Sequence, residues 1–195
     1  MRGRSALAWT ILLDLRQTGS SLFWIDEGTD SGAIAAQASF DLSGDEYLSD
    51  LMSMQMNNLR TMLGRLMVDL KSGNRPATPQ IDENATYLAV RRPEDGRIDW
   101  GQDADAVLRI VRAVSRPYPG AFGFLGENTF RIWRARIVDM RNWFALPGQI
   151  FTTIDGCPVI RCGGQTSILI EDFQIESQDG SLQTVPKLGN QRRLF

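Results

Sequence analysis

The 195-residue chain contains no histidine. Acid–base chemistry by this chain therefore depends on its carboxylates and its basic side chains. Without an imidazole, the chain cannot complete a Ser-His-Asp or Cys-His arrangement. An acidic, glycine-bearing loop has the sequence DEGTDSG at residues 26–32. Taken alone, Asp30 is a turn residue, Asp26 and Glu27 are solvated charges, and Arg4 is a surface charge near the start of the chain.

The two cysteines, Cys157 and Cys162, do not indicate a metal site. Structural zinc usually takes four Cys or His ligands, and no histidine is present to complete such a set. We therefore expect no bound metal and two reduced thiols in or near a strand.

A second charged group consists of four arginines in the C-terminal half, Arg131, Arg134, Arg136 and Arg141. In a tRNA-binding protein such a cluster would contact phosphates. The alternative is a solvated strand face on which the arginines are partly paired, and the sequence leaves both interpretations open. The net charge of −2 provides no overall field that would attract nucleic acid or an anionic membrane.

Four elements are expected in the N-terminal part of the chain. They are a helix at 6–13, a short strand at 21–25, an extended run at 33–40 and a long helix at 45–71. Ser5 is the expected cap of the first helix. Ser43 and Glu46 have the Ser-x-x-Glu spacing of a capping box before the long helix, and residues 17–20 are expected to form a turn.

Residues 74–102 contain two early prolines and little apolar periodicity, so we interpret them as a linker. A third helix is expected to start after Asp103. Short β-prone runs with glycine-containing turns between them then favour a small barrel. These runs lie at 121–125, 129–138, 148–153, 158–162 and 167–174, and residues 188–195 are expected to be a peripheral tail or short helix.

No apolar run approaches the roughly 20 residues needed to span a bilayer, so no membrane association is expected. The first 13 residues superficially resemble a signal peptide. They lack a small-residue cleavage site, and charges close the apolar stretch quickly, which favours a cytoplasmic location.

Two stretches carry a family resemblance. The first comprises RGRSALAW at residues 2–9, TG at 18–19 and IDEGTDSGAI at 25–34. The second comprises ATY at 85–87, RPEDGRIDW at 92–100 and RAVSRPYPGAF at 112–122. Together they resemble folate-dependent formyltransferases, a family that includes methionyl-tRNA formyltransferase and enzymes that formylate nucleotide-linked amino sugars. The second stretch is more similar to the sugar enzymes.

The resemblance implies an α/β chain in two parts. Residues 1–73 would be the C-terminal remnant of a Rossmann-like catalytic domain, 74–102 the linker, and 103–195 an OB-like β-barrel domain. The implied reaction transfers a formyl group from 10-formyltetrahydrofolate to a primary amine. The acceptor would be a nucleotide amino sugar or, alternatively, initiator methionyl-tRNA. A third alternative is a catalytically inactive binding module.

The resemblance also assigns roles to residues. The family carries an Asn-x-His-x-Ser-x-Leu-Pro motif just before the segment matching Arg2, so this chain resembles an N-terminally truncated member that lacks two of three catalytic residues. Asp30 matches the third catalytic residue, whose carboxylate would orient the histidine. The loop that lies against the folate would be Asp26, Glu27, Gly28 and Thr29, and Arg4 matches a position near the folate or substrate. The oligomeric state is not indicated.

Overall fold

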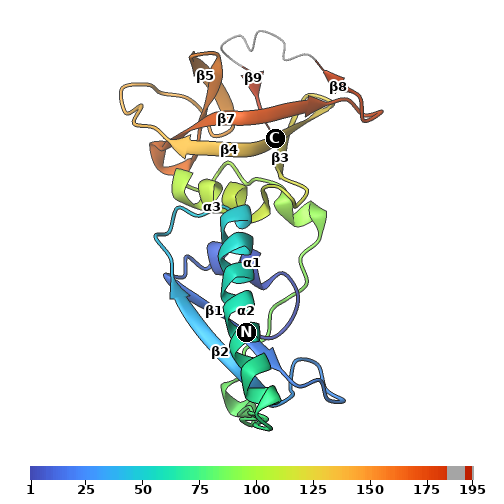
Figure 1. Cartoon of the computed structure of the whole chain (residues 1–195). Helices are drawn as coiled ribbons and strands as arrows, with labels where there is room; N and C mark the ends of the chain where they lie inside the picture. The colour runs from blue at the N-terminus through green and yellow to red at the C-terminus, as the bar shows by residue number, and fades with distance from the viewer. Residues whose placement is uncertain (184–191, 195) are drawn as a thin grey trace. The chain divides into compact units, whose positions relative to one another are not determined.

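The structure is a computed structural model that describes residues 1–183 and 192–194. The chain divides into two compact units, residues 1–91 and residues 92–195 (Figure 1). Each unit contains helix and strand, which confirms the expected mixed α/β class.

The first unit contains two helices and a two-stranded antiparallel sheet. The elements are α1 (Ala6–Leu12), β1 (Gln17–Phe23), β2 (Ile34–Asp41), α2 (Leu48–Lys71) and a 3-10 turn, η1 (Asp82–Asn84). Strands β1 and β2 pair from Gln17 opposite Asp41 to Phe23 opposite Ile34. The long helix α2 lies beside both strands (Figure 1). It buries one apolar stripe, which consists of Leu48, Leu51, Met62 and Leu66.

Three local expectations for this unit were wrong in detail. Residues 17–20 belong to strand β1 rather than to a turn, because pairing with β2 continues to its end. Ser5 makes no side-chain capping bond and has a left-handed backbone, with φ 63°. The Glu46 carboxylate does accept a bond from the Ser43 amide at 2.7 Å, but this closes a loop before the helix, and the Tyr47 amide donates to Asp50 at its actual start.

The segment that follows α2, residues 74–91, packs against the earlier elements of the first unit. The Ile34 and Thr78 backbones exchange hydrogen bonds of 2.8 and 2.9 Å. The Arg2 amide donates to the Thr86 carbonyl at 2.7 Å, and the indole nitrogen of Trp24 donates to the Pro76 carbonyl at 2.7 Å. Residues 74–91 are therefore held by regular backbone contacts and belong to this compact unit.

The second unit is an antiparallel sheet with one helix against it. Its helical elements are η2 (Pro93–Gly96), α3 (Ala104–Val114) and η3 (Gly163–Gln165). Its strands are β3 (Ala121–Leu125), β4 (Asn128–Ile137), β5 (Gln149–Ile154), β6 (Cys157–Arg161), β7 (Ser167–Glu176), β8 (Leu182–Gln183) and β9 (Arg192–Arg193). Asp103 caps α3 as expected, accepting a bond from the Ala106 amide at 2.8 Å.

The core of the second unit lies between α3 and the sheet. Val107 and Val111 on α3 are fully buried, as are Phe130 and Ile132 on β4. Burial of each such side chain stabilises the fold by about 1.5–3 kcal/mol. Buried and partly exposed residues alternate along β3, and the buried ones mark the face of the sheet that the helix covers.

The described strands of this sheet follow the order β3-β4-β7-β6-β5-β9. Strand β8 lies outside this order and pairs with the end of β7, at Ile175 and Glu176. Within the described residues, the path does not close on itself, so an OB-like barrel stays a prediction. Most of the expected tail at 188–195 lies outside the described residues. Within it, Arg192–Arg193 pairs with β5 as a strand.

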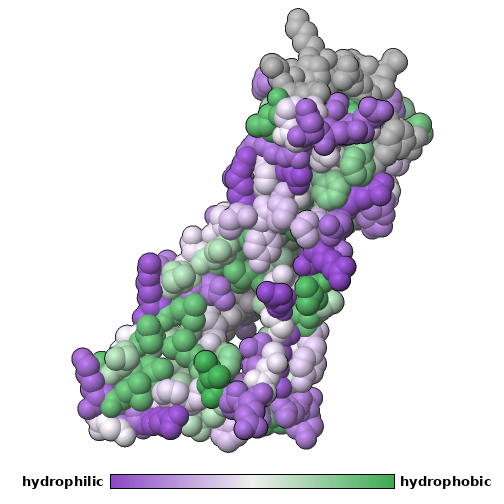
Figure 2. Space-filling model, turned by 90° about the vertical axis from the view of Figure 1, so that its right-hand side faces the viewer, coloured by the Kyte–Doolittle hydropathy of each residue, from purple (hydrophilic) through white to green (hydrophobic). Residues whose placement is uncertain are grey.

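Helix α2 also has a row of exposed apolar side chains, and the space-filling view shows green apolar surface on the first unit (Figure 2). The row consists of Met52, Met56, Leu63, Met67 and Val68, each at least 40% exposed. No helix among the described residues is both long enough and apolar enough to cross a membrane.

Candidate active site

Asp30 lies in the loop between β1 and β2, with its side chain turned toward the start of the chain. The backbone amide of Gly3 donates to its carboxylate oxygen Oδ2 at 3.2 Å. Asp30 is half-buried and has a left-handed backbone, with φ 55°. Aspartate tolerates this region better than most residues. Two parts of the first stretch that carried the resemblance, residues 2–4 and 25–34, therefore meet at this carboxylate.

Gln80 fixes the backbone of the same loop from a distant part of the sequence. Its side-chain nitrogen donates to the carbonyls of Asp30 and Gly32, at 2.9 and 2.7 Å. Its side-chain oxygen accepts a bond of 3.1 Å from the Arg2 guanidinium. One amide side chain thus connects the Arg2 segment with the loop that holds Asp30.

The Arg2 guanidinium is held on its other side by Asp82, with the two groups 2.9 Å apart. The Arg2 side chain is only 10% exposed. The hydrogen bond that Arg2 donates to the Asp82 carboxylate raises the pKa of Arg2, against the opposing effect of burial. Arg2 is therefore a permanently charged anchor for Gln80.

Asp26 orders the rest of the loop from within. Its Oδ1 atom accepts bonds from the Gly28 amide at 3.0 Å and the Ser31 hydroxyl at 2.8 Å. A Cβ atom added at Gly32 would lie 1.6 Å from the Trp24 carbonyl oxygen, so only glycine fits there. The carboxylate of Asp26 is thus engaged in shaping the loop.

The other sequence-predicted residues form the exposed edge of this region. Glu27, Gly28 and Thr29 are exposed, and so is Arg4. Within the described part of the chain, Arg4 makes no hydrogen bond or ion pair. The structure brings Asp30 and the segment of Arg2 and Gly3 together, but it does not bring the Arg4 side chain into contact with the loop.

An open hollow with a volume of about 360 Å³ lies beside this network. Arg2 and Gln80 form its charged and polar wall, and Ile34 and Ile81 contribute apolar surface. Sequence reasoning missed the part that Gln80 plays, because no regular spacing connects residue 80 with residue 30. The motif around Arg2 was recognised, but the buried, anchored arginine is Arg2 rather than Arg4.

The four clustered arginines that the sequence singled out are each paired with a carboxylate. Arg131 makes a two-pronged contact with Glu176, with bonds of 2.9 and 2.8 Å. Glu171 lies 3.7 Å from Arg134 and 3.1 Å from Arg136. Arg141 pairs with Asp139, which raises the pKa of Arg141. The cluster is therefore a mixed-charge surface rather than a free basic strip.

The two cysteines are free thiols. Burial raises the pKa of Cys162 to about 12, which makes this thiol unreactive at neutral pH. Within residues 1–183 and 192–194, no three His, Cys, Asp or Glu side chains lie together as a metal-binding group.

Residues 91–182 match the family described as formyl transferase, C-terminal domain. This match covers most of the second unit, and the resemblance of the chain to the formyltransferase family is confirmed.

Solved structures with the same fold include HypX from Aquifex aeolicus in complex with tetrahydrofolic acid, 22% identical with a TM-score of 0.77. The match covers 95% of this chain and 32% of HypX. An N-formyltransferase from Helicobacter canadensis, in complex with folinic acid and dTDP-3-aminofucose, is 14% identical with a TM-score of 0.64 and coverages of 87% and 61%. Methionyl-tRNA formyltransferase from Clostridium thermocellum is 25% identical, with a TM-score of 0.56 and coverages of 72% and 59%. This chain thus spans less than two thirds of each of these proteins.

Proposed function

We propose that this chain supplies part of a formyltransferase that uses 10-formyltetrahydrofolate as donor and a primary amine as acceptor. The bound folate would supply the formyl group. Asp30 would hold and orient an imidazole, and the loop Asp26–Thr29 would contact the folate. Arg4 would attract an anionic group of the folate or the acceptor. A cytoplasmic location and the division into a catalytic remnant, a linker and a C-terminal domain belong to the same proposal.

The observation that carries this proposal is the Asp30 carboxylate beside Gly3. Its Oδ2 atom lies 3.2 Å from the Gly3 amide, and Gln80 holds its backbone. A half-buried carboxylate with a fixed backbone suits the orientation of an imidazole, because it selects one tautomer and favours the protonated ring. The exposed residues Glu27, Gly28 and Thr29 present a polar edge on which a heterocyclic ligand would lie.

The histidine must come from outside these 195 residues, because they contain none. The coding sequence upstream of Met1 is the first test. A frame that continues and encodes Asn-x-His-x-Ser-x-Leu-Pro next to Arg2 supports the enzyme. An upstream stop codon in that frame, with no longer transcript, would count against it.

The second test measures formyl transfer by the 195-residue chain and by any upstream-extended form. We expect no turnover of 10-formyltetrahydrofolate by the chain alone, and turnover by the extended form that falls at least a hundredfold in Asp30→Asn. Glu127→Gln, an exposed carboxylate in the other unit, is the control and should leave the rate unchanged. Full activity of the Asp30→Asn variant would refute the role of Asp30.

For the acceptor, we propose an amino sugar linked to a nucleotide, with methionyl-tRNA as the alternative. The carboxylate pairing of the four arginines favours the sugar, because paired arginines release fewer counterions on binding a polyanion. The extended form should be assayed with dTDP- and UDP-linked amino sugars and with methionyl-tRNA. Formylation of the tRNA alone would overturn the sugar assignment.

A function of a different class is a catalytically inactive module that binds a nucleotide sugar, RNA or a protein through its second unit. The absence of histidine from the chain favours it. The two functions separate by experiment. The inactive module would bind its ligand both as the 195-residue chain and as an upstream-extended chain, and neither chain would release tetrahydrofolate from the donor.

A further inference from the structure

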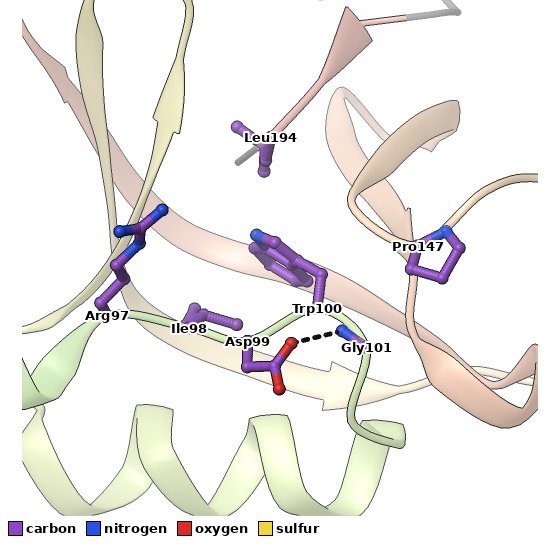
Figure 3. A pocket seen from close by; sticks show the side chains of 7 residues that line it. All are labelled: Arg97, Ile98, Asp99, Trp100, Gly101, Pro147 and Leu194. Carbon is purple, nitrogen blue, oxygen red and sulfur yellow. Dashed lines mark hydrogen bonds between the residues drawn. The ribbon is translucent and has the colours of Figure 1, made fainter.

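The second unit contains a hollow that the formyl-transfer proposal does not use. Its volume is about 520 Å³. The segment 97–101, which leads from η2 to α3, forms its floor, with Pro147 at one side and Leu194 above the Trp100 ring (Figure 3). All these residues lie between 92 and 195, so the hollow belongs to one compact unit.

A buried donor without a partner faces this hollow. The Trp100 side chain is only 5% exposed, and among the described residues its ring nitrogen has no hydrogen-bond partner. A buried N–H group left without an acceptor costs about 1–3 kcal/mol. Figure 3 shows this nitrogen turned toward the space between Arg97 and Leu194. The Trp100 N–H group is therefore available to donate a hydrogen bond to an oxygen atom of a ligand in the hollow.

The Arg97 guanidinium is the cation at this hollow, and it lies on the same side as the Trp100 ring nitrogen (Figure 3). The Arg97 guanidinium is 5.3 Å from the centre of the Phe124 ring, which supports its position. Among the described residues it has no carboxylate partner. Figure 3 shows the Arg97 side chain rising on the same side of the segment as the Trp100 ring. A guanidinium beside an indole N–H is a combination that suits an oxyanion.

Asp99 is the one carboxylate among the described residues that line the hollow, and it does not cancel this charge. Asp99 accepts bonds from the Gly101 amide at 2.9 Å and from the Gln102 side chain at 3.1 Å. The Gln102 bond, followed by the Gly101 bond, lowers the pKa of Asp99. Its side chain points to the opposite side of the segment from the Trp100 ring (Figure 3). Asp99 thus shapes the turn and leaves Arg97 as the charge that a ligand meets.

We propose that this hollow binds a small oxyanion-bearing ligand, either a phosphate or a carboxylate. One of its oxygens accepts from the Trp100 ring nitrogen and another pairs with Arg97. The proposal is independent of formyl transfer, because the candidate active site lies within residues 1–91 and this hollow does not.

The experiment is a titration of the whole chain followed by the indole N–H resonances in proton–nitrogen NMR spectra. The resonance missing from Trp100→Phe identifies that ring. Inorganic pyrophosphate is one probe and succinate the other, so that the two oxyanion sources are tested separately. We expect a saturable shift of the Trp100 resonance with at least one probe, and the probe with the lower Kd identifies the source.

Arg97→Gln should weaken this binding about tenfold or more, because a charge-assisted contact is lost. Arg97→Lys, which keeps the charge, should recover part of the affinity. Arg60→Gln, which removes an exposed charge from α2, is the matched control and should have no effect. The spectra of each variant also show whether the second unit remains folded.

Two results would overturn the proposal. One is a Trp100 resonance that does not move with either probe up to about 50 mM, a concentration far above ordinary ligand affinities. The other is a shift that is unchanged in Arg97→Gln, or reduced equally in Arg60→Gln, since either shows a general charge effect rather than a site.

Discussion

Replacement of Gln80 by leucine removes the side-chain amide that connects the two halves of the candidate active site. Leucine has a similar volume, so the change deletes hydrogen bonds more than packing. Three bonds are lost, to the carbonyls of Asp30 and Gly32 and from the guanidinium of Arg2. At roughly 0.5–1.5 kcal/mol each, they sum to about 3 kcal/mol.

The half-exposed position of Gln80 reduces this figure, because water can replace part of the lost bonding. The carbonyl of the buried Gly32 is the group least able to find water. We therefore expect Gln80→Leu to lower the free energy of unfolding of the first unit by about 2 kcal/mol. The same loss should speed amide exchange across residues 26–34 more than elsewhere in that unit.

The measurement is urea unfolding of the whole chain, with hydrogen exchange resolved by residue to separate the two units. Gln37→Leu is the matched control, since it removes a single exposed bond of 2.7 Å to the Ser21 hydroxyl. We expect its effect to stay within about 0.5 kcal/mol. Equal effects of the two substitutions, or unchanged exchange at residues 26–34 in Gln80→Leu, would refute the bridging role.

Three further predictions concern the remaining charges and the two units. Partial burial of Glu46 opposes ionisation, but bonds from the Ser43 hydroxyl and the backbone amides lower its pKa from 4.5 to about 2. Its folded pKa thus lies below its unfolded pKa, so its contribution to stability is present above about pH 4.5 and is lost as the pH falls toward 2. Glu46→Gln should flatten that part of the stability–pH curve, and an identical acid limb in both proteins would contradict this assignment. Arg131→Gln should lower the stability of the second unit by about 1–2 kcal/mol in urea unfolding, because it breaks a two-pronged, mostly buried pair. Arg141→Gln breaks an exposed pair and should leave the unfolding curve unchanged. Finally, amides of β1 and β2 should exchange faster than those of β4 and β7, because a two-stranded sheet is only marginally stable. Equal protection of the two sheets would show that the first unit has another source of stability.

Local signals in the sequence predicted most elements of the second unit. Asp103 predicted the start of α3, and glycine-containing turns predicted the boundaries between the strands. The first unit was harder to predict. The spacing of Ser43 and Glu46 correctly predicted a hydrogen bond between them, but it placed the start of the helix too early. Tyr47 and Asp50 make the bond that caps the helix instead.

The candidate site was predictable only in part, because its parts are far apart in the sequence. The motif at residues 25–34 pointed to Asp30, and its loop position is as expected. The contact from the Gly3 amide and the support from Gln80 depend on how a proline-containing segment packs, and no periodicity encodes that. The pairing of Arg134 and Arg136 with Glu171 was equally hidden, since partners on neighbouring strands are set by register rather than by spacing along the chain.

The backbone path after α2 has a practical meaning for protein engineering. A shortened fragment that stops with the long helix at Lys71 would discard Gln80, Asp82 and the Thr78 contact to Ile34. Such a piece would keep every residue of the acidic loop and still lose its scaffold. Any chimera that exchanges C-terminal modules among related proteins should therefore be joined after Arg91, with the first 91 residues moved as one block.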